Sequence, residues 1–319
     1  MDIHTIKRVL HPNAILSAAA LSILVLLLLF PSFGIDAVNR ALTLCAASVI
    51  PSLFPFFVLN NILIASGFPE KCALFLDKPF RFLFGINGSG AAAFLLGALS
   101  GYPNGARCAS ELYERGLCTA DEAERLLSFT NNTSPAFLIG FIGSTLFGSP
   151  KTGALLYLFQ LIAAILTGIL EQLFFRDAAQ KPDASVPARK AGQSSGRGIL
   201  PTAIRDAVFS ILTVCGSVLF FSVLLALLSR LLRGHMQLYL GACVFLELTS
   251  ACAEAEALLP RPIALLVISA AVSWSGCSVH AQTASFVCGK LSLSRYFCGK
   301  LLCCVITVLL TACFLFLFP

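Results

Sequence analysis

The sequence predicts an all-α polytopic membrane protein built from two inverted repeats, in which re-entrant helical hairpins pack on discontinuous helices. Three observations carry this prediction. Of the 319 residues, 57% are hydrophobic and 12% are charged, a composition typical of an integral membrane protein. Several apolar runs reach the roughly 20 residues that cross a hydrocarbon core. Each half of the chain also contains a short, interrupted apolar run, which is typical of transporters built from repeats.

Five apolar runs are long enough to be assigned as membrane spans. They cover residues 14–34, 41–67, 152–174, 208–232 and 301–318. Lys7 and Arg8 precede the first run as they would precede a signal peptide. That run is long, however, and lacks a small-x-small cleavage site, so we interpret it as an uncleaved span.

Basic residues beside the spans predict the orientation of the chain in the cell membrane. Lys7 and Arg8 precede the first span, and residues 176–205 carry Lys181, Arg189, Lys190 and Arg197. Under the positive-inside rule, both the N-terminus and this central segment are cytoplasmic. The net charge of +6 is explained by this bias, so we predict no nucleic-acid partner.

The central segment also divides the chain. Its run DAAQKPDASVPARKAGQSSGRG is rich in Pro, Ala, Ser and Gly and has no apolar periodicity, as flexible linkers do. We therefore predict four parts: an N-terminal span and loop (1–40), a first membrane repeat (41–175), a basic cytoplasmic linker (176–201) and a second membrane repeat (202–319).

The run SGYPNGAR, residues 100–107, follows an apolar segment too short to cross the membrane. We expect a half-helix over residues 87–101, a tip formed by GYPNG, and a returning helix over residues 106–115. Gly116 then stands where helices prefer a C-terminal glycine. Thr119 and Glu122 have the spacing of a capping box, which predicts the start of the next helix.

That next helix is predicted to break in the middle of the membrane. The run SFTNNTSPAF combines a proline with side chains that compete for backbone hydrogen bonds. Irregular backbone at this depth must be buried in protein or line a polar cavity, so we expect the break to face the hairpin tip. The candidate solute-binding residues of this half are Ser100, Tyr102, Asn104, Asn131, Asn132, Thr133 and Ser134.

The second half is predicted to repeat this plan from the outer face. Sliding the halves along each other pairs Ser100 with Ser273 and Arg107 with His280, which places the second hairpin tip in SWSGCSVHAQ, within residues 238–289. The candidate solute-binding residues of this half are Glu247, Thr249, Ser250, Ser273, Ser275, Ser278, His280 and Gln282. For each Ser and Thr the alternative is a structural hydroxyl that bonds its own backbone or joins two helices, and for His280 it is a helix cap.

Glu247 stands apart because it is ionisable and lies in the apolar run YLGACVFLELT. Placing such a group in lipid costs roughly 2.5 kcal/mol or more on insertion scales, and such residues mark ion or substrate paths. We predict a proton- or sodium-coupling carboxylate, with a buried structural pair as the alternative.

Two stretches together resemble a known family. GALSGYPNGARCASELYERGLCTADEAERLLSFTNNTSPAF, residues 97–137, and the later LELTSAC look like the sporulation integral membrane proteins of YlbJ type, which carry a Gate or nucleoside-recognition domain. Gate domains are similar to the core of concentrative nucleoside transporters. The resemblance implies re-entrant hairpins on discontinuous helices around a central site, in a spore-forming bacterium.

Three classes of function follow from these features. A membrane transporter or sensor of a small polar solute, nucleoside-like by the resemblance, explains the repeats, the half-helices and Glu247 together. A structural or partner-docking membrane protein of spore assembly is the alternative. A hydrolase is the weakest, because Ser278 and His280 are two apart and no Gly-x-Ser-x-Gly or His-Glu-x-x-His motif occurs.

We accordingly predict no enzymatic activity. The thirteen cysteines show no Cys-x-x-Cys spacing, so no structural metal site is predicted. No cofactor is predicted beyond a coupling ion, sodium or proton. The expected partners are the lipid bilayer and a small polar solute, and the sequence is compatible with a homo-oligomer.

Overall fold

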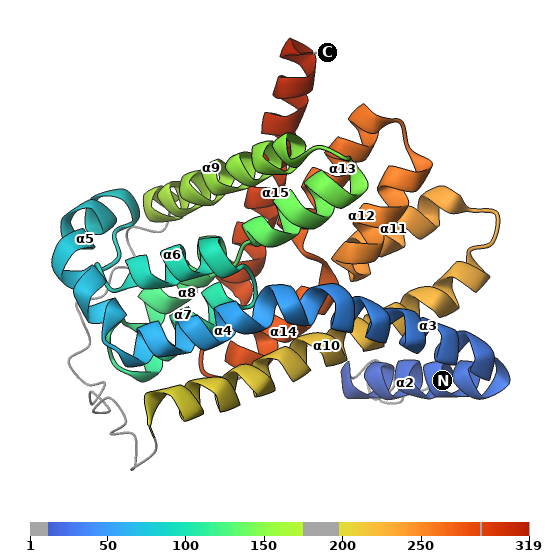
Figure 1. Cartoon of the computed structure of the whole chain (residues 1–319), viewed down its shortest axis with the longest axis horizontal. Coiled ribbons are helices and arrows are strands. Elements are labelled where there is room, and N and C mark those ends of the chain that lie inside the picture. The colour runs from blue at the N-terminus through green and yellow to red at the C-terminus, as the bar shows by residue number, and fades with distance from the viewer. Residues whose placement is uncertain (1–11, 175–197, 288, 319) are drawn as a thin grey trace, which may run out of the picture.

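The computed structural model describes residues 12–174, 198–287 and 289–318, and all regular structure in those ranges is helical (Figure 1). Four helices are long and apolar enough to cross a membrane, or up to six if each of two bent helix pairs counts as one span. The basic residues on which the predicted orientation depends lie outside the described ranges: Lys7, Arg8, Lys181, Arg189, Lys190 and Arg197.

The N-terminal helices differ from the predicted spans. Helix α2 (Pro12–Leu29) meets α3 (Pro31–Leu44) at Phe30 with a bend of 101°. Pro31 explains the bend, because proline cannot donate the backbone hydrogen bond that would continue α2. Helix α3 then runs through the π-helical turn η1 (Cys45–Val49) into α4 (Ile50–Ala65). The prediction of a first span over residues 14–34 was therefore wrong at its end, and residues 41–65 belong to a longer helical run.

Helix α5 (Phe68–Phe84) follows α4 after a bend of 77°. It is amphipathic: Cys72, Phe80 and Phe84 are buried, whereas Lys71, Lys78 and Arg81 are exposed. Gly67 begins this bend with φ +80°, a left-handed conformation that glycine adopts without strain.

The first hairpin and the first broken helix form where the sequence predicts them. Helix α6 (Gly90–Ser100) ends at Gly101, and α7 (Asn104–Glu114) returns beside it. Both hydrogen bonds of the predicted capping box start α8 (Ala120–Thr130). Residues 131–134 are not helical, and the π-helix η2 (Ala136–Leu146) continues after them, followed by α9 (Pro150–Phe174).

The second half has the same kinds of element in a different register from the predicted one. After α10 (Ile199–Leu231), helices α11 (Met236–Leu246) and α12 (Leu248–Leu258) form the hairpin, with its tip at Glu247. Helices α13 (Arg261–Trp274) and α14 (Gly276–Val287) run on together as one candidate span, and α15 (Ser294–Leu317) closes the chain.

The predicted hairpin tip in SWSGCSVHAQ is therefore wrong. Ser275 and Gly276 have φ +78° and +73°, and these two left-handed residues interrupt the helix without reversing it. Ser100 lies at a hairpin tip, whereas its predicted counterpart Ser273 lies in an interrupted helix. The pairing by sequence failed because the two halves share too few identities to fix a register.

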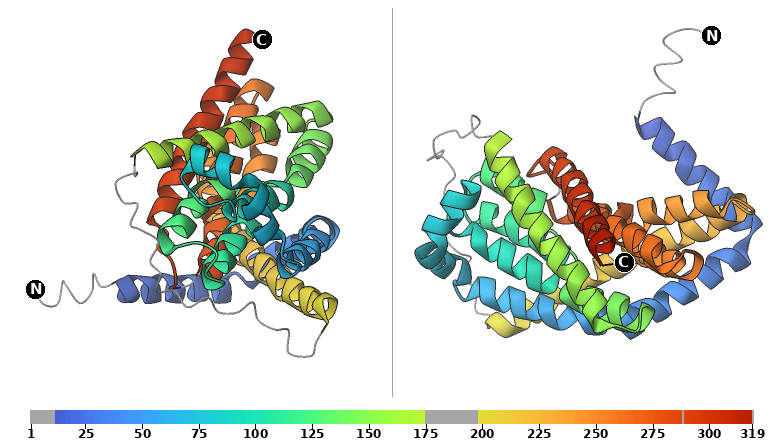
Figure 2. Two further views of the ribbon diagram at one scale, coloured as in Figure 1. Left: turned by 90° about the vertical axis from the view of Figure 1, so that its left-hand side faces the viewer. Right: turned by 90° about the horizontal axis from the view of Figure 1, so that it is seen from above.

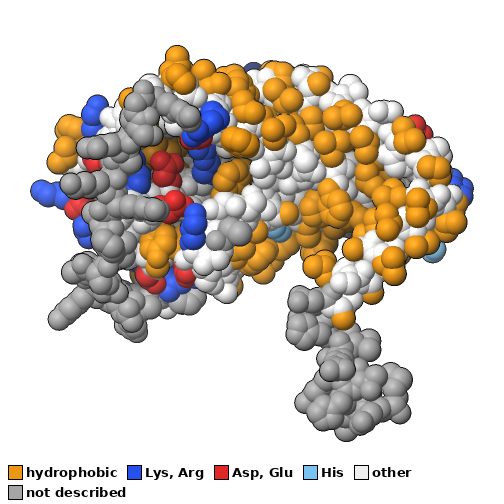
Figure 3. All heavy atoms as spheres, turned by 90° about the horizontal axis from the view of Figure 1, so that it is seen from below, with side chains coloured by type: hydrophobic (Ala, Val, Ile, Leu, Met, Phe, Trp, Pro, Cys, Tyr) orange, Lys and Arg blue, Asp and Glu red, His pale blue; other side chains and the backbone are white. Residues whose placement is uncertain are grey.

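The two hairpins point toward the middle of the molecule from opposite ends (Figures 1 and 2). The hairpin α6–α7 lies at the end that carries α5, and α11–α12 lies at the other end. Figure 3 shows that most Lys, Arg, Asp and Glu side chains on the viewed face gather at the α5 end, whereas hydrophobic side chains dominate elsewhere. Ion pairs there include Arg115 with Glu70 at 2.8 Å and Arg295 with Asp121 at 2.9 Å.

Candidate functional site

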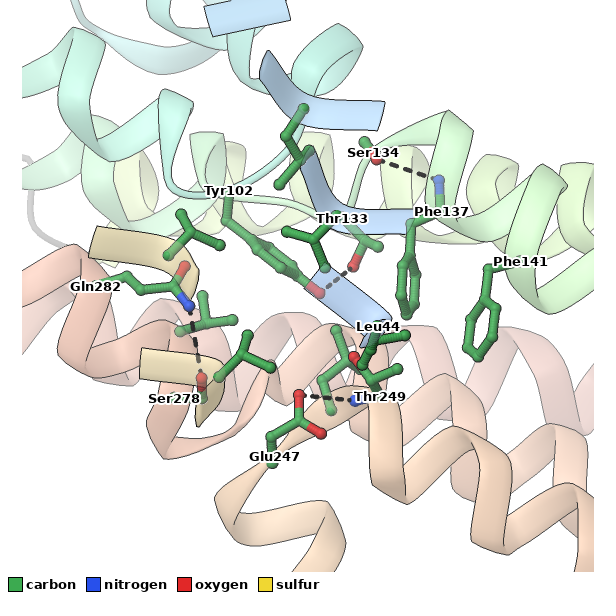
Figure 4. A pocket seen from close by; sticks show the side chains of 16 residues that line it. Leu44, Tyr102, Thr133, Ser134, Phe137, Phe141, Glu247, Thr249, Ser278 and Gln282 are labelled. Atoms are coloured by element: carbon green, nitrogen blue, oxygen red, sulfur yellow. Dashed lines mark hydrogen bonds between the residues drawn. The ribbon is translucent and has the colours of Figure 1, made fainter. Parts of the chain in front are cut away.

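A cavity lies where the two hairpin tips and the two helix interruptions meet (Figure 4). Its volume is about 70 Å³, whereas one buried water needs roughly 10–15 Å³. Seven candidate residues line it: Tyr102, Thr133, Ser134, Glu247, Thr249, Ser278 and Gln282. The remaining wall is apolar and comes from α3, η1, α4, η2, α10, α12 and α14: Leu44, Val49, Leu53, Phe137, Phe141, Val214, Val218, Leu248 and Val279.

The C-terminal turn of α8 is held by three glycines on neighbouring helices. An added Cβ would lie 2.2 Å from the Thr130 carbonyl oxygen at Gly97 and 2.1 Å from it at Gly105. At Gly299 of α15, a Cβ would lie 2.4 Å from the Ser128 carbonyl oxygen. Both arms of the first hairpin and α15 can therefore approach the α8 backbone only because these residues lack side chains.

The break after α8 leaves carbonyl groups that the helix no longer pairs. The Asn132 carbonyl accepts a hydrogen bond from the Tyr102 backbone N–H at 2.6 Å, so the hairpin tip docks directly on the break. The Asn131 carbonyl accepts one from the Lys300 ammonium at 2.8 Å. The tip and the break face each other, as the sequence argument predicted.

A second group of hydrogen bonds joins the two interrupted helices. The Val272 carbonyl, near the end of α13, accepts from the Thr133 hydroxyl at 3.0 Å and from the Gln160 amide at 3.2 Å. The Gln160 amide also donates to the Thr133 hydroxyl oxygen at 3.0 Å. Thr133 thus lies between the α8–η2 break and the α13–α14 break. Thr133, Gln160 and Val272 are all buried.

Glu247 forms the tip of the second hairpin and caps α12. Its two carboxylate oxygens accept from the backbone N–H groups of Thr249 at 3.1 Å and Ser250 at 2.8 Å. The side chain is almost fully buried although it borders the cavity. A carboxylate at a helix N-terminus is stabilised by the unpaired N–H groups and the helix dipole, which explains how this chain tolerates a buried carboxylate.

The other candidate residues of the first half are buried but do not line the cavity. The Ser100 hydroxyl accepts from the Asn60 amide at 2.6 Å. The Asn131 amide donates to the Thr283 hydroxyl at 2.9 Å, and the Asn132 amide donates to the Phe129 carbonyl at 2.7 Å. The amide nitrogen of Asn104 has no hydrogen-bond partner within the described part of the chain.

Four candidates of the second half likewise lie outside the cavity lining. His280 Nδ1 lies 2.8 Å from the Tyr296 hydroxyl, and the indole ring of Trp274 packs edge-on against the imidazole. Ser273 and Ser275 are fully buried beside the α13–α14 interruption. Ser250 contributes its backbone N–H to the Glu247 cap.

Sequence reasoning missed Lys300 and Gln160, whose side chains complete the two groups of hydrogen bonds around the breaks. Lys300 carried the same signal as Glu247, an ionisable group inside the apolar run YFCGKLLCCVITVLL. Two arginines also have partners far away in the sequence: Arg115 pairs with Glu70, and Arg125 donates to the Phe84 carbonyl.

These helices, hairpins and interruptions define a multi-pass helical membrane protein with a central cavity. The chain is similar to the sporulation integral membrane protein YlbJ of Bacillus subtilis strain 168, with 30% identity over 214 residues. The match covers 62% of this chain and 52% of YlbJ, so the chain spans about half the length of this curated relative. No protein-family profile matches the chain, and no solved structure matches it either.

Proposed function

We propose that the protein binds a small, neutral, polar solute in the central cavity and moves or senses it across the membrane of a spore-forming bacterium. The observation that carries the proposal is the convergence of two hairpin tips and two helix interruptions on one cavity. Hairpins that enter from opposite ends around interrupted helices are the arrangement of transporters built from inverted repeats. Similarity to YlbJ supports the cellular context.

The chemistry of the lining favours an uncharged solute. Tyr102, Thr133, Ser134, Thr249, Ser278 and Gln282 offer hydroxyl and amide groups that both donate and accept hydrogen bonds. The lining carboxylate, that of Glu247, already accepts two backbone hydrogen bonds. A neutral molecule with several hydroxyl or amide groups would match this set.

The size of the cavity limits the solute. Its volume of about 70 Å³ lies well below the roughly 300–1,000 Å³ of typical ligand pockets. In this conformation it has room for several waters or one very small molecule. A nucleoside, the solute that the Gate resemblance implies, would require the tips at Tyr102 and Glu247 to separate.

Thermal shifts of the purified protein test the proposal. We expect at least one of urea, glycerol, ribose, uridine and adenosine to raise the melting temperature in detergent, and to exchange across proteoliposomes loaded with the same solute. Ser278→Ala and Thr249→Val should weaken binding by about 1–3 kcal/mol each, because a buried polar group of the solute loses its partner. Ser285→Ala is the matched control, since Ser285 lies in the same helix as Ser278 but does not line the cavity, and its hydroxyl donates to a backbone carbonyl, that of Gln282.

A non-transporting docking protein for spore assembly is the alternative. Protein groups already donate hydrogen bonds to the backbone carbonyls of Asn131, Asn132 and Val272. The helix interruptions therefore need no solute for their stability, which is compatible with the docking function. If no compound in the panel shifts the melting temperature or exchanges, and if Ser278→Ala behaves like Ser285→Ala throughout, the solute proposal is refuted and the docking function is favoured.

A further inference from the structure

Lys300 is a buried lysine in the second turn of the apolar helix α15. The residue is 1% exposed, and within the described ranges no carboxylate lies within 4.0 Å of its ammonium group. Burying an unpaired ammonium is strongly unfavourable, so its surroundings must supply the compensation. The hydrogen bond that the structure gives its Nζ runs to the Asn131 carbonyl at 2.8 Å.

That carbonyl belongs to the C-terminal end of α8. The last carbonyl groups of a helix lack helical partners and together carry about half a negative charge. Gly299 brings α15 against the Ser128 backbone, which places the next residue, Lys300, at this end of α8. Asn131 also has a buried side-chain oxygen without a hydrogen-bond partner in the described part of the chain. The end of α8 therefore offers oxygen acceptors and no positive group of its own.

In transporters with interrupted helices, such C-terminal ends and unwound carbonyls help to coordinate the coupling cation, for example sodium. An ammonium is a cation with three donors and no acceptor, so it satisfies the same oxygens. We propose that Lys300 is a tethered cation that takes the place of a dissociable coupling ion at the end of α8, so that the folded protein needs no sodium there. The proposal goes beyond solute binding and is tested on the empty protein.

The opposite charge at the second hairpin fits this interpretation. The N-terminus of α12 is a place where an anion binds, and Glu247 of the same chain fills it. The charged ends of these two half-helices, α8 and α12, are thus both neutralised by side chains of the protein. Apart from the Glu247 carboxylate, the polar side chains that line the cavity carry hydroxyl or amide groups.

The experiment compares melting temperatures in sodium, potassium and choline chloride at equal ionic strength, without solute. The unmodified protein should melt at the same temperature in all three. Lys300→Ala leaves space at the α8 end, so its lowered melting temperature should rise by at least about 3 °C in sodium chloride or on addition of propylammonium, which replaces the missing chain. Lys300→Met fills the space without a charge and should show no rise.

Lys290→Ala is the matched control, because Lys290 is exposed and pairs with Glu114 on the surface. A Lys300→Ala protein that neither sodium, potassium nor propylammonium stabilises would overturn the proposal. So would an unmodified protein that melts higher in sodium than in choline, and this second measurement stands even if Lys300→Ala does not fold. Neither result depends on the identity of a transported solute. Refutation of the tethered-cation proposal is therefore distinct from refutation of the proposed function.

Discussion

Gly105→Ala tests how tightly the first hairpin is bound to the broken helix. An alanine Cβ would lie 2.1 Å from the Thr130 carbonyl oxygen and 2.6 Å from its carbonyl carbon. Contacts between non-bonded atoms are comfortable at about 3.5 Å, so α7 or α8 would have to move by roughly 1 Å or more. Such a shift would also stretch the bond between the Tyr102 N–H and the Asn132 carbonyl.

Two opposing effects set the size of the change. Forcing extra atoms into a packed interior costs about 1–3 kcal/mol and occasionally more, and an overlap with backbone belongs at the upper end. Alanine recovers up to about 1 kcal/mol of helix propensity relative to glycine. We therefore expect a net loss of about 2 kcal/mol, or a fall in melting temperature of roughly 4–8 °C.

The assay is size-exclusion chromatography of a fluorescent fusion after heating in detergent. Gly140→Ala is the control, because Gly140 is helical and an added Cβ there meets nothing within 4 Å. The control should melt at or slightly above the temperature of the unmodified protein. If Gly105→Ala melts as high as Gly140→Ala, the close approach of α7 to α8 is not a constraint and the reasoning fails.

Three further predictions concern caps and topology. Thr119→Ala removes the capping box of α8 and should destabilise the protein by about 1 kcal/mol, which heating in detergent would show as a lower melting temperature. Glu247→Gln leaves one of two backbone N–H groups of α12 without an acceptor and should lower stability by about 0.5–2 kcal/mol. If solute uptake by this variant keeps its dependence on pH and sodium, Glu247 only caps the helix. Single cysteines at Arg81 and Arg261, in a cysteine-free background, should react with an impermeant reagent from opposite sides of the membrane, and reaction from the same side would refute the inverted arrangement.

Local signals predicted the first half well. Gly116, the Thr119 capping box and the run NNTS each act within a few residues, so the ends of α7 and α8 could be inferred from sequence. That the hairpin tip faces the helix break could be predicted from one physical rule: irregular backbone in a membrane must be buried or must line a cavity.

The second half required information that local patterns do not carry. Ser275 and Gly276 look like a turn, but whether a left-handed pair reverses a helix or only interrupts it depends on what packs on either side. Glu247 is exceptional in the sequence as an ionisable residue in an apolar run. Its capping role depends on the α11–α12 hairpin, whereas the sequence predicted the hairpin tip in SWSGCSVHAQ. The Lys300 ammonium donates to the carbonyl of Asn131, which lies in the other half of the chain, and no local sequence pattern reveals such a contact.

The three glycines around the end of α8 also determine which parts of this protein can move independently. With Gly97, Gly105 and Gly299 in backbone contact with Thr130 or Ser128, sliding of one helix along another would collide with a main chain. The first hairpin, α8 and α15 are therefore packed as one unit around the end of α8. The entry to the second hairpin has no such constraint: an added Cβ at Gly234, where φ is +86°, would meet nothing within 4 Å.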